Sequence, residues 1–423
     1  MTPGGTPHDR HRHPRRHPWL DPTLLRQTPF RRYWTGQSVS LLGDQITELA
    51  LPLFAVLVAA AGPAEMGYLT AAALVPNLLF SLLFGGWADR RAYKRQIMVA
   101  ADVARAVALL AVPALYLLGT LDMTQLYLVA FTVGTFSVLF EVCRSTLFVS
   151  LVSRDDFLQA NALLNGSRAF STVAGASVGG VLVRLVGAPF ALLLDALSFV
   201  FSAVMIARVE VVEPVPVPRR GLGLREGLTF IARHPIMRAA VSASTTINLF
   251  NYMYAALVIL YLTTELNISA AVLGVGLGLA AVGALIGAAI ARRAAERFGV
   301  GPMYVFGYLM FPAPLILIPL AGGPHWLVLA MVFTAEFLSG VGVMLLDTAA
   351  GSLQASVIPD ELRARVTGAH RTINYGIRPV GALVGGALGT AIGVRETLWI
   401  ATVGALAGVL WLLASPIPRM RRL

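Results

Sequence analysis

Acidic side chains inside long apolar segments are the residues of this sequence best suited to chemistry, because a carboxylate can bind and release a proton. Asp44 and Glu48 lie in the apolar segment 34–60, and Glu336 lies in the segment 325–347. An acid at the centre of a bilayer costs about 2.5–3.5 kcal/mol on insertion scales, so each is expected to face a cavity or a partner. Proton coupling is one hypothesis for these three acids. A permanent ion pair is the alternative, and the candidate partners are Arg105, Arg168, Arg371 and Arg378.

Other polar side chains share the helical faces of these acids. Gln37 and Ser40 precede Asp44 and Glu48 at intervals of three and four residues, which places all four on one face of a helix. A similar face without charge occurs in the segment 238–262 and comprises Ser244, Asn248 and Asn251. Such stripes are unfavourable against lipid, so these residues are candidates for lining a cavity. Asp44 is the preferred proton-coupling residue, because like charges on Asp44 and Glu48 would favour a single shared proton.

A glycine pattern that occurs twice indicates how the helices around these faces are arranged. Gly175-Ala176-Ser177-Val178-Gly179-Gly180 recurs as Gly381-Ala382-Leu383-Val384-Gly385-Gly386, shifted by 206 positions (381 − 175). Glycines four apart form a flat face on which another helix can pack closely. We therefore expect two similar halves, with helix packing at Gly175, Gly179, Gly180, Gly381, Gly385 and Gly386.

The composition is that of a polytopic membrane protein. Of 423 residues, 57% are hydrophobic and 13% are charged, and the mean hydropathy is +0.72. Soluble domains average about 25% charged residues. The net charge of +11 comes mostly from arginine, which follows a membrane pattern and therefore does not indicate nucleic-acid binding. One cysteine, Cys143, excludes a disulfide framework.

Apolar segments long enough to cross a bilayer occur twelve times, six in each half. We place them at roughly 34–60, 66–88, 96–118, 124–146, 162–185, 188–208, 238–262, 270–291, 302–321, 325–347, 366–392 and 396–414. Arginines gather in alternate loops and at both ends of the chain, which predicts that both termini are cytoplasmic in a multi-pass protein of the cytoplasmic membrane.

The predicted domains follow from these spans. They are a basic cytoplasmic tail at 1–32, a six-helix bundle at 33–208, a cytoplasmic linker at 209–236, a second bundle at 237–414 and a basic tail at 415–423. Residues 223–234 of the linker are expected to form a short surface helix. The histidines of the first tail could bind a metal. A disordered basic segment near anionic lipid is the favoured interpretation, so no metal site is predicted.

The loop after the second span resembles the signature loop of the major facilitator superfamily, on the run Gly85-Gly86-Trp87-Ala88-Asp89-Arg90-Arg91-Ala92-Tyr93-Lys94-Arg95. Gly85, Asp89, Arg90 and Lys94 match its pattern, and Glu296-Arg297 repeats the acid and arginine in the second half. The glycine stretch at 175–180 is similar to the antiporter motif of this superfamily. The resemblance implies that these charged residues form a cytoplasmic gate, to which we add Glu141 and Asp347, and that spans 1, 4, 7 and 10 line a central cavity.

Two further runs are similar to the branch that holds macrolide-efflux pumps and the enterobactin exporter. They are Phe30-Arg31-x-x-Trp34-x-Gly-Gln37-x-x-Ser40-x-x-Gly43-Asp44 and Ile358-Pro359-Asp360-Glu361-Leu362-Arg363. This resemblance implies an all-α, twelve-helix transporter without catalytic residues. It would export an amphipathic small molecule, such as an antibiotic or a siderophore, by proton antiport.

The expected partners of such a transporter are substrate, lipid and protons. The proton gradient is its energy source and no cofactor is expected, while a monomer is compatible with the sequence. Two alternatives remain open. One is a lipid or solute transporter of the same fold, and the other is a membrane receptor or scaffold that does not transport.

Overall fold

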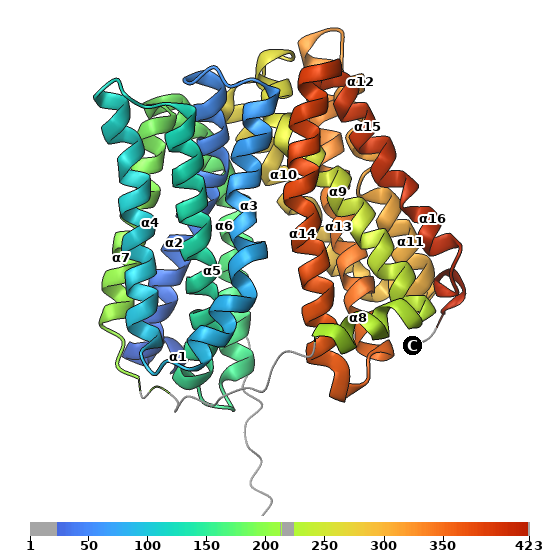
Figure 1. Cartoon of the computed structure of the whole chain (residues 1–423), viewed down its shortest axis with the longest axis horizontal. Helices are drawn as coiled ribbons and strands as arrows, with labels where there is room; N and C mark the ends of the chain where they lie inside the picture. Colours follow the sequence, from blue (N-terminus) through green and yellow to red (C-terminus); the bar gives the residue numbers. More distant parts are fainter. Residues whose placement is uncertain (1–22, 212, 214–223, 422–423) are drawn as a thin grey trace, which may run out of the picture.

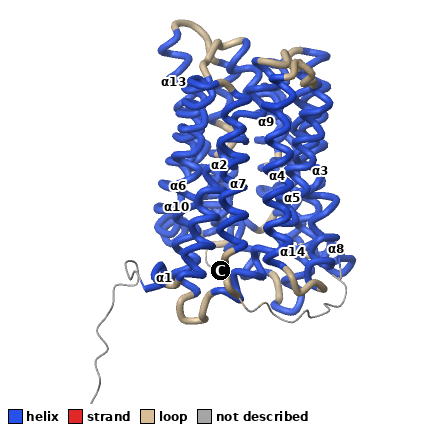
Figure 2. Tube along the Cα trace, turned by 90° about the vertical axis from the view of Figure 1, so that its left-hand side faces the viewer, coloured by secondary structure: helices blue, strands red, loops and turns tan. Residues whose placement is uncertain are grey.

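The computed structural model describes residues 23–211, 213 and 224–421, which form two helical bundles side by side (Figure 1). All regular structure in these ranges is helical, as Figure 2 shows. Most of the predicted basic tail, including its histidines, and much of the predicted linker lie outside the described residues. The prediction of an all-helical membrane fold is confirmed.

Six long helices make up the first bundle. They are α2 (Thr28–Leu57), α3 (Pro63–Asp89), α4 (Lys94–Leu117), α5 (Met123–Leu151), α6 (Phe157–Val186) and α7 (Ala188–Ala207), and the short α1 (Thr23–Arg26) precedes them. Short connections join them, so consecutive helices run in opposite directions. Pro63 and Pro189 stand in the first turns of α3 and α7, where a missing backbone N–H costs nothing.

The second bundle repeats this arrangement after α8 (Leu224–Arg233), the short helix expected in the linker. It comprises α9 (Pro235–Thr264), α10 (Ala270–Phe298), α11 (Val300–Met310) with η1 (Pro314–Ile316) and α12 (Leu317–Leu320), α13 (His325–Val357), α14 (Asp360–Ile392), and α15 (Val394–Ala407) with α16 (Val409–Leu413). The turn η2 (Ile417–Arg419) follows. The interrupted helices correspond to single expected spans, and in the first of them α11 ends at Met310, two residues before Pro312.

Ten segments of the described chain are long and apolar enough to cross a membrane. α3 and α14 have 27 and 33 residues, also more than the roughly 20 that a bilayer needs, and they complete the twelve-helix arrangement. Several helices continue beyond the predicted spans, most clearly α5 to Leu151 and α13 to Val357. Hydropathy marks the apolar part of a helix, whereas backbone hydrogen bonding continues into the polar region beyond it.

The repeated glycines pack against equivalent helices inside each half. A Cβ added at Gly179 of α6 would lie 3.2 Å from the Cα of Ile46 in α2, and one added at Gly385 of α14 would lie 2.9 Å from the Cα of Met253 in α9. The pairs are related by shifts of 206 (385 − 179) and 207 (253 − 46) positions. Both contacts therefore support a duplicated architecture in which glycine lets a helix approach the first helix of its own half.

The neighbouring glycines make a second pair of contacts, between the halves. Gly180 of α6 crosses Gly274 of α10, and Gly386 of α14 crosses Gly67 of α3. A Cβ on any of these four would lie 2.9–3.0 Å from the Cα of the facing glycine. Gly67 and Gly274 are early in their helices, whereas Gly180 and Gly386 are late in theirs, so all four lie at one end of the molecule. α1, α8 and the C-terminus lie at the opposite end (Figure 1).

The inter-half contact predicts that a single methyl group at Gly274 is harmful. Gly274→Ala would place its Cβ 2.5 Å from the carbonyl oxygen of Ala176, whereas Gly276→Ala, one half-turn away, meets nothing closer than 3.9 Å. We expect Gly274→Ala to destabilise this contact by about 1–3 kcal/mol, the usual cost of overpacking. Spin-label distances between α3 and α14 would measure the separation of the halves. A distribution unchanged from wild type would contradict the prediction, and Gly276→Ala is the matched control.

Candidate functional site

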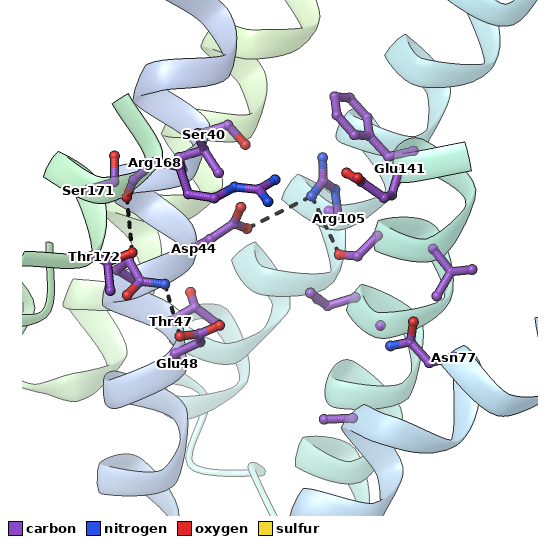
Figure 3. A pocket seen from close by; sticks show the side chains of 18 of the residues that line it. Ser40, Asp44, Thr47, Glu48, Asn77, Arg105, Glu141, Arg168, Ser171 and Thr172 are labelled. Carbon is purple, nitrogen blue, oxygen red and sulfur yellow. Dashed lines mark hydrogen bonds and ion pairs between the residues drawn. The ribbon is translucent and has the colours of Figure 1, made fainter. Parts of the chain in front are cut away.

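A cavity of about 1060 Å³ lies within the first half and extends to the facing surface of the second. Helices α2 to α6 supply most of its walls, and α9 adds Tyr252, Ala255 and Ile259 (Figure 3). The lining reaches Phe148 and Phe157, at the end of the bundle that carries α1. Spans 1, 4 and 7 line this cavity as expected, but α13, the tenth span, contributes none of the described lining residues.

The polar stripe of α2 faces this cavity. Gln37, Ser40, Asp44 and Glu48 all belong to its lining, and Gln37 and Ser40 are buried. The Gln45 side-chain amide donates a 2.9 Å hydrogen bond to Glu48 Oε2. Figure 3 shows Asp44 and Glu48 one turn apart on the same side of α2. The helical spacing thus brings two acids to the lining of one cavity.

Arg105 of α4 is the central cation of the site. It is 3% exposed, forms an ion pair with Asp102 on its own helix, and places Nη1 3.9 Å from Asp44 Oδ1. Its guanidinium carbon lies 4.0 Å from the ring centroid of Phe199 and 4.6 Å from that of Phe140. One guanidinium therefore links α2, α4, α5 and α7. Asp102 lies closer to the guanidinium than Asp44 does, so the interaction between Arg105 and Asp44 is the weaker of the two.

Arg168 of α6 also lines the cavity, and Figure 3 shows its guanidinium beside the carboxylate of Asp44. It has no ion pair within 4.0 Å in the described residues, although its charge acts on Asp44. The charges of two guanidinium groups therefore act on Asp44, whose side chain is 36% exposed. This geometry combines features of both sequence hypotheses, because Asp44 has cationic neighbours and is also accessible to a proton or a ligand.

Asp195 of α7, which the sequence left unassigned, lies behind α2 and is fully buried. Its carboxylate accepts hydrogen bonds from the hydroxyl groups of Thr47 and Ser198, the latter at 2.8 Å. A Cβ at Gly43 would lie 2.1 Å from Asp195 Oδ1, so glycine is needed for this approach. Thr47 also lines the cavity, and it therefore connects the cavity with a carboxyl that has no ion pair in the described structure. The only sign of this buried carboxyl in the sequence was an aspartate within the apolar segment 188–208.

Glu336 is the one proton-coupling candidate outside the described cavity. It lies on α13 toward α10, with Cγ 3.9 Å from the position of a Cβ at Gly276. Its charge acts on Tyr254, whose buried hydroxyl has no hydrogen-bond partner in the described residues. The structure thus separates Glu336 from Asp44 and Glu48, because Glu336 is not among the described residues that line the cavity.

The polar face predicted in α9 forms a hydrogen-bonded cluster with α14. Ser244 Oγ and Asn248 Nδ2 donate to Asn374 Oδ1 at 2.9 and 3.2 Å, and Asn248 Nδ2 also donates to the Ser244 carbonyl. Arg378 Nε donates to Asn248 Oδ1 at 3.1 Å. Ser244 and Asn248 are absent from the described cavity lining, and Asn251 is half-buried outside it. Tyr252, the next residue on α9, lines the cavity instead.

The predicted gate residues of the 2–3 loop divide into two groups. The buried Lys94 begins α4 and its Nζ donates to the Arg91 carbonyl at 3.0 Å. The backbone N–H groups of Lys94 and Arg95 donate to the Glu213 carboxylate, which therefore caps this helix. Sequence reasoning missed Glu213 because it lies 119 positions away. Gly85 faces open space, Arg90 is exposed, and the side chain of Asp89 lies outside the described residues.

The remaining gate candidates occupy different environments. Glu141 lines the cavity and forms an ion pair with Arg144 of the same helix. Glu296 accepts a 2.8 Å hydrogen bond from Arg292 on the exposed end of α10, and Arg297 packs over Phe298. Asp347 is exposed on α13 within the electrostatic influence of Arg378. The structure therefore does not gather these four into one cluster.

The two bundles, their glycine crossings and the polar cavity define a secondary transporter of the major facilitator type, which is a multi-pass membrane protein and not an enzyme. Residues 21–423 match the family described as transmembrane secretion effector, and the chain belongs to that family. It is 25% identical over 405 residues to the multidrug efflux pump Tap of Mycolicibacterium fortuitum, which covers 90% of this chain and 93% of Tap.

Solved structures show the same fold at lower identity. The nucleoside transporter NupG has a TM-score of 0.76 at 10% identity, covering 92% of this chain and 99% of its own. A bacterial homologue of the iron transporter ferroportin has a TM-score of 0.75 in its inward-facing state, at 17% identity and with 92% and 98% coverage. The outward-facing structure of that homologue, soaked with iron, scores 0.58 at 16% identity, with 91% and 98% coverage.

The environment of Arg105 predicts a large effect of its removal. Arg105→Gln would leave the fully buried Asp102 without its cation, and breaking a buried pair in this way costs about 3–5 kcal/mol. Adding Asp102→Asn is expected to restore part of the loss. Asp44→Asn is expected to cost less, because its pair is longer and faces the cavity. Thermal unfolding in detergent measures all three, and Arg292→Gln is the exposed control. Equal melting temperatures for Arg105→Gln and wild type would contradict the assignment.

Proposed function

We propose that this protein exports amphipathic compounds that carry a cationic group, in exchange for protons. The observation that carries the proposal is the position of Asp44 and Glu48 on one face of α2, both lining the same cavity. A carboxylate in such a space can hold either a proton or a cationic group of a substrate. Competition between the two for the same acids would couple their movements in opposite directions.

Arg105 supports a specific role for Asp44 in this exchange. Asp102 holds the guanidinium closely, while Asp44 lies 3.9 Å from it. Protonation of Asp44 would therefore remove a weak contact and leave the Arg105–Asp102 pair intact. Deprotonation would restore a charge that Arg105 and Arg168 both stabilise. Asp44 can change its protonation state without disrupting the bundle, which a proton carrier requires.

The direction and the conformational cycle have separate support. Tap, the curated relative, is named a multidrug efflux pump, which favours export. The higher TM-score to the inward-facing ferroportin homologue than to its outward-facing form supports a cytoplasm-facing cavity, given the predicted topology. Substrate would enter from the end that carries α1 and α8. Separation of the glycine crossings at the opposite end would then release it, as the two bundles rock about the cavity.

The polar lining favours this proposal over lipid movement or a non-transporting scaffold. Asp44, Glu48, Asn77, Asn161 and Arg168 all line the cavity. A lipid chain would meet an unfavourable surface there, and a scaffold has no need for acids in such a position. Inverted vesicles with an imposed pH gradient, screened against antibiotics and siderophores, test the proposal directly. No pH-dependent transport of any compound in the panel would overturn it.

The role of Asp44 makes a sharper prediction. Asp44→Asn mimics the protonated form, so it is expected to reduce pH-driven export of a cationic dye such as ethidium to background and to weaken dye binding without abolishing it, because Glu48 remains in the cavity. Asp44→Glu, which keeps a carboxylate, is expected to retain part of the coupling. Glu48→Gln is expected to slow export without abolishing it, because Glu48 has only the Gln45 hydrogen bond to position it.

Proton flux recorded together with dye flux distinguishes coupling from a structural role. A folded Asp44→Asn protein that still moves protons with dye contradicts the assignment of Asp44. Glu336→Gln is the matched control, since Glu336 is a membrane acid outside the described cavity lining. Loss of coupling in Glu336→Gln but not in Asp44→Asn would transfer the role to the second half.

A further inference from the structure

Arg378 is a cation near the middle of α14 whose charge the described structure does not balance closely. No carboxylate of the described residues lies within 4.0 Å of its guanidinium, and Asp347 is the acid on which it acts at longer range. Arg105 and Arg144, in contrast, each have a close acidic partner. An intramembrane charge is costly and indicates a functional site when the protein does not neutralise it.

The guanidinium is held in one orientation by three side chains. Its carbon lies 4.5 Å from the ring centroid of Tyr375 and 5.1 Å from that of Tyr252. Nε donates to Asn248 Oδ1, and the Asn248 amide nitrogen is already engaged by Ser244 and Asn374. The Asn248 oxygen is therefore directed at Arg378. This arrangement fixes Nε and leaves the two Nη groups as the donors for an additional acceptor.

The position of Tyr252 connects this guanidinium with the cavity. Tyr252 lines the cavity, and the charges of both Arg378 and Glu48 act on its hydroxyl. Glu48 belongs to the first half and Arg378 to the second, so charges of opposite sign from the two halves act on Tyr252. Arg378 itself is not among the described lining residues, so a compound in the cavity would meet the guanidinium only with a group that extends past the Tyr252 ring, 5.1 Å from the guanidinium carbon.

We infer that Arg378 binds a carboxylate of the substrate, and that the transported compounds are zwitterions with an amine directed to Asp44 and Glu48. This inference rests on the proposed function and specifies its substrate class. The two Nη groups of arginine match the two oxygens of a carboxylate. A single guanidinium neutralises a monoanion, whereas a phosphate dianion would need a second close cation. Arg371, the nearest other arginine on α14, lies two turns before Arg378 and is exposed. Its guanidinium carbon is 5.5 Å from the centroid of the same Tyr375 ring.

The test uses a pair of probes that differ by one charge. Ciprofloxacin carries an amine and a carboxylate, and its methyl ester keeps the amine alone. For the wild-type protein in detergent, we expect the acid to bind about tenfold more tightly than the ester, measured by the fluorescence of the probe. Arg378→Gln is expected to reduce that ratio to about one while leaving the affinity for the ester unchanged. Arg378→Lys is expected to give an intermediate ratio, since an ammonium lacks the planar fork.

Arg371→Gln is the matched control and is expected to keep the wild-type ratio. A wild-type ratio near one, or a ratio that survives Arg378→Gln, would overturn the inference. So would recovery of Arg378→Gln by Glu48→Gln, which would indicate an ion pair between the halves. If ethidium is exported but neither probe binds, the carboxylate site is wrong and the proposed export stands. If no compound of the vesicle panel is exported, the proposed function itself fails.

Discussion

Two glycine-on-glycine crossings between the halves are the constraint on which the rest of this structure depends. Gly180 against Gly274 and Gly67 against Gly386 bring backbones together at one end of the molecule. Any side chain there would separate the halves, so the contact exists only because four positions lack a Cβ. Closure at that end leaves the cavity reaching toward the opposite end, beside α1 and α8. The described structure has no salt bridge at these crossings, but buried apolar residues of both halves, among them Met66, Val183 and Leu273, form one core beside them, so opening that end would expose this apolar surface.

The two halves share their glycine packing positions but differ in their charged residues. The first half holds a network in which Arg105 is shared between Asp102 and Asp44, with Asp195 reached through Thr47. The second half has Arg378 between two tyrosines and an asparagine. Duplication therefore explains the packing positions but not the charges. Function follows the differences between the halves, because a symmetric cavity would present the same chemistry to both ends of a substrate.

The sequence predicted what depends on periodicity and composition, and it missed what depends on partners distant in the chain. Apolar length placed the helices, and spacing placed Gln37, Ser40, Asp44 and Glu48 on one cavity face. Spacing does not reveal what faces a helix, so it could not separate Glu336 from the cavity acids. The cap of α4 by Glu213 and the hydroxyl partners of Asp195 involve contacts across more than 100 positions. The gate residues failed to cluster for the same reason, since a motif defines neighbours only along the chain.

The charged residues of the two halves lie on different bundles, so the distances between them change when the bundles move. Asp44 and Glu48 move with the first bundle, and Arg378 moves with the second, so rocking of the halves changes the distance between the acids and the guanidinium. A ligand that contacts the acids of the first bundle and the guanidinium of the second binds best at one distance between them. Such a ligand therefore opposes the rocking of the halves. In the exchange proposed above, a proton on Asp44 would weaken one of those contacts and lower that resistance. Coupling in this view needs no signal through the bundle, because the ligand itself joins the two halves and the proton changes how firmly it does so.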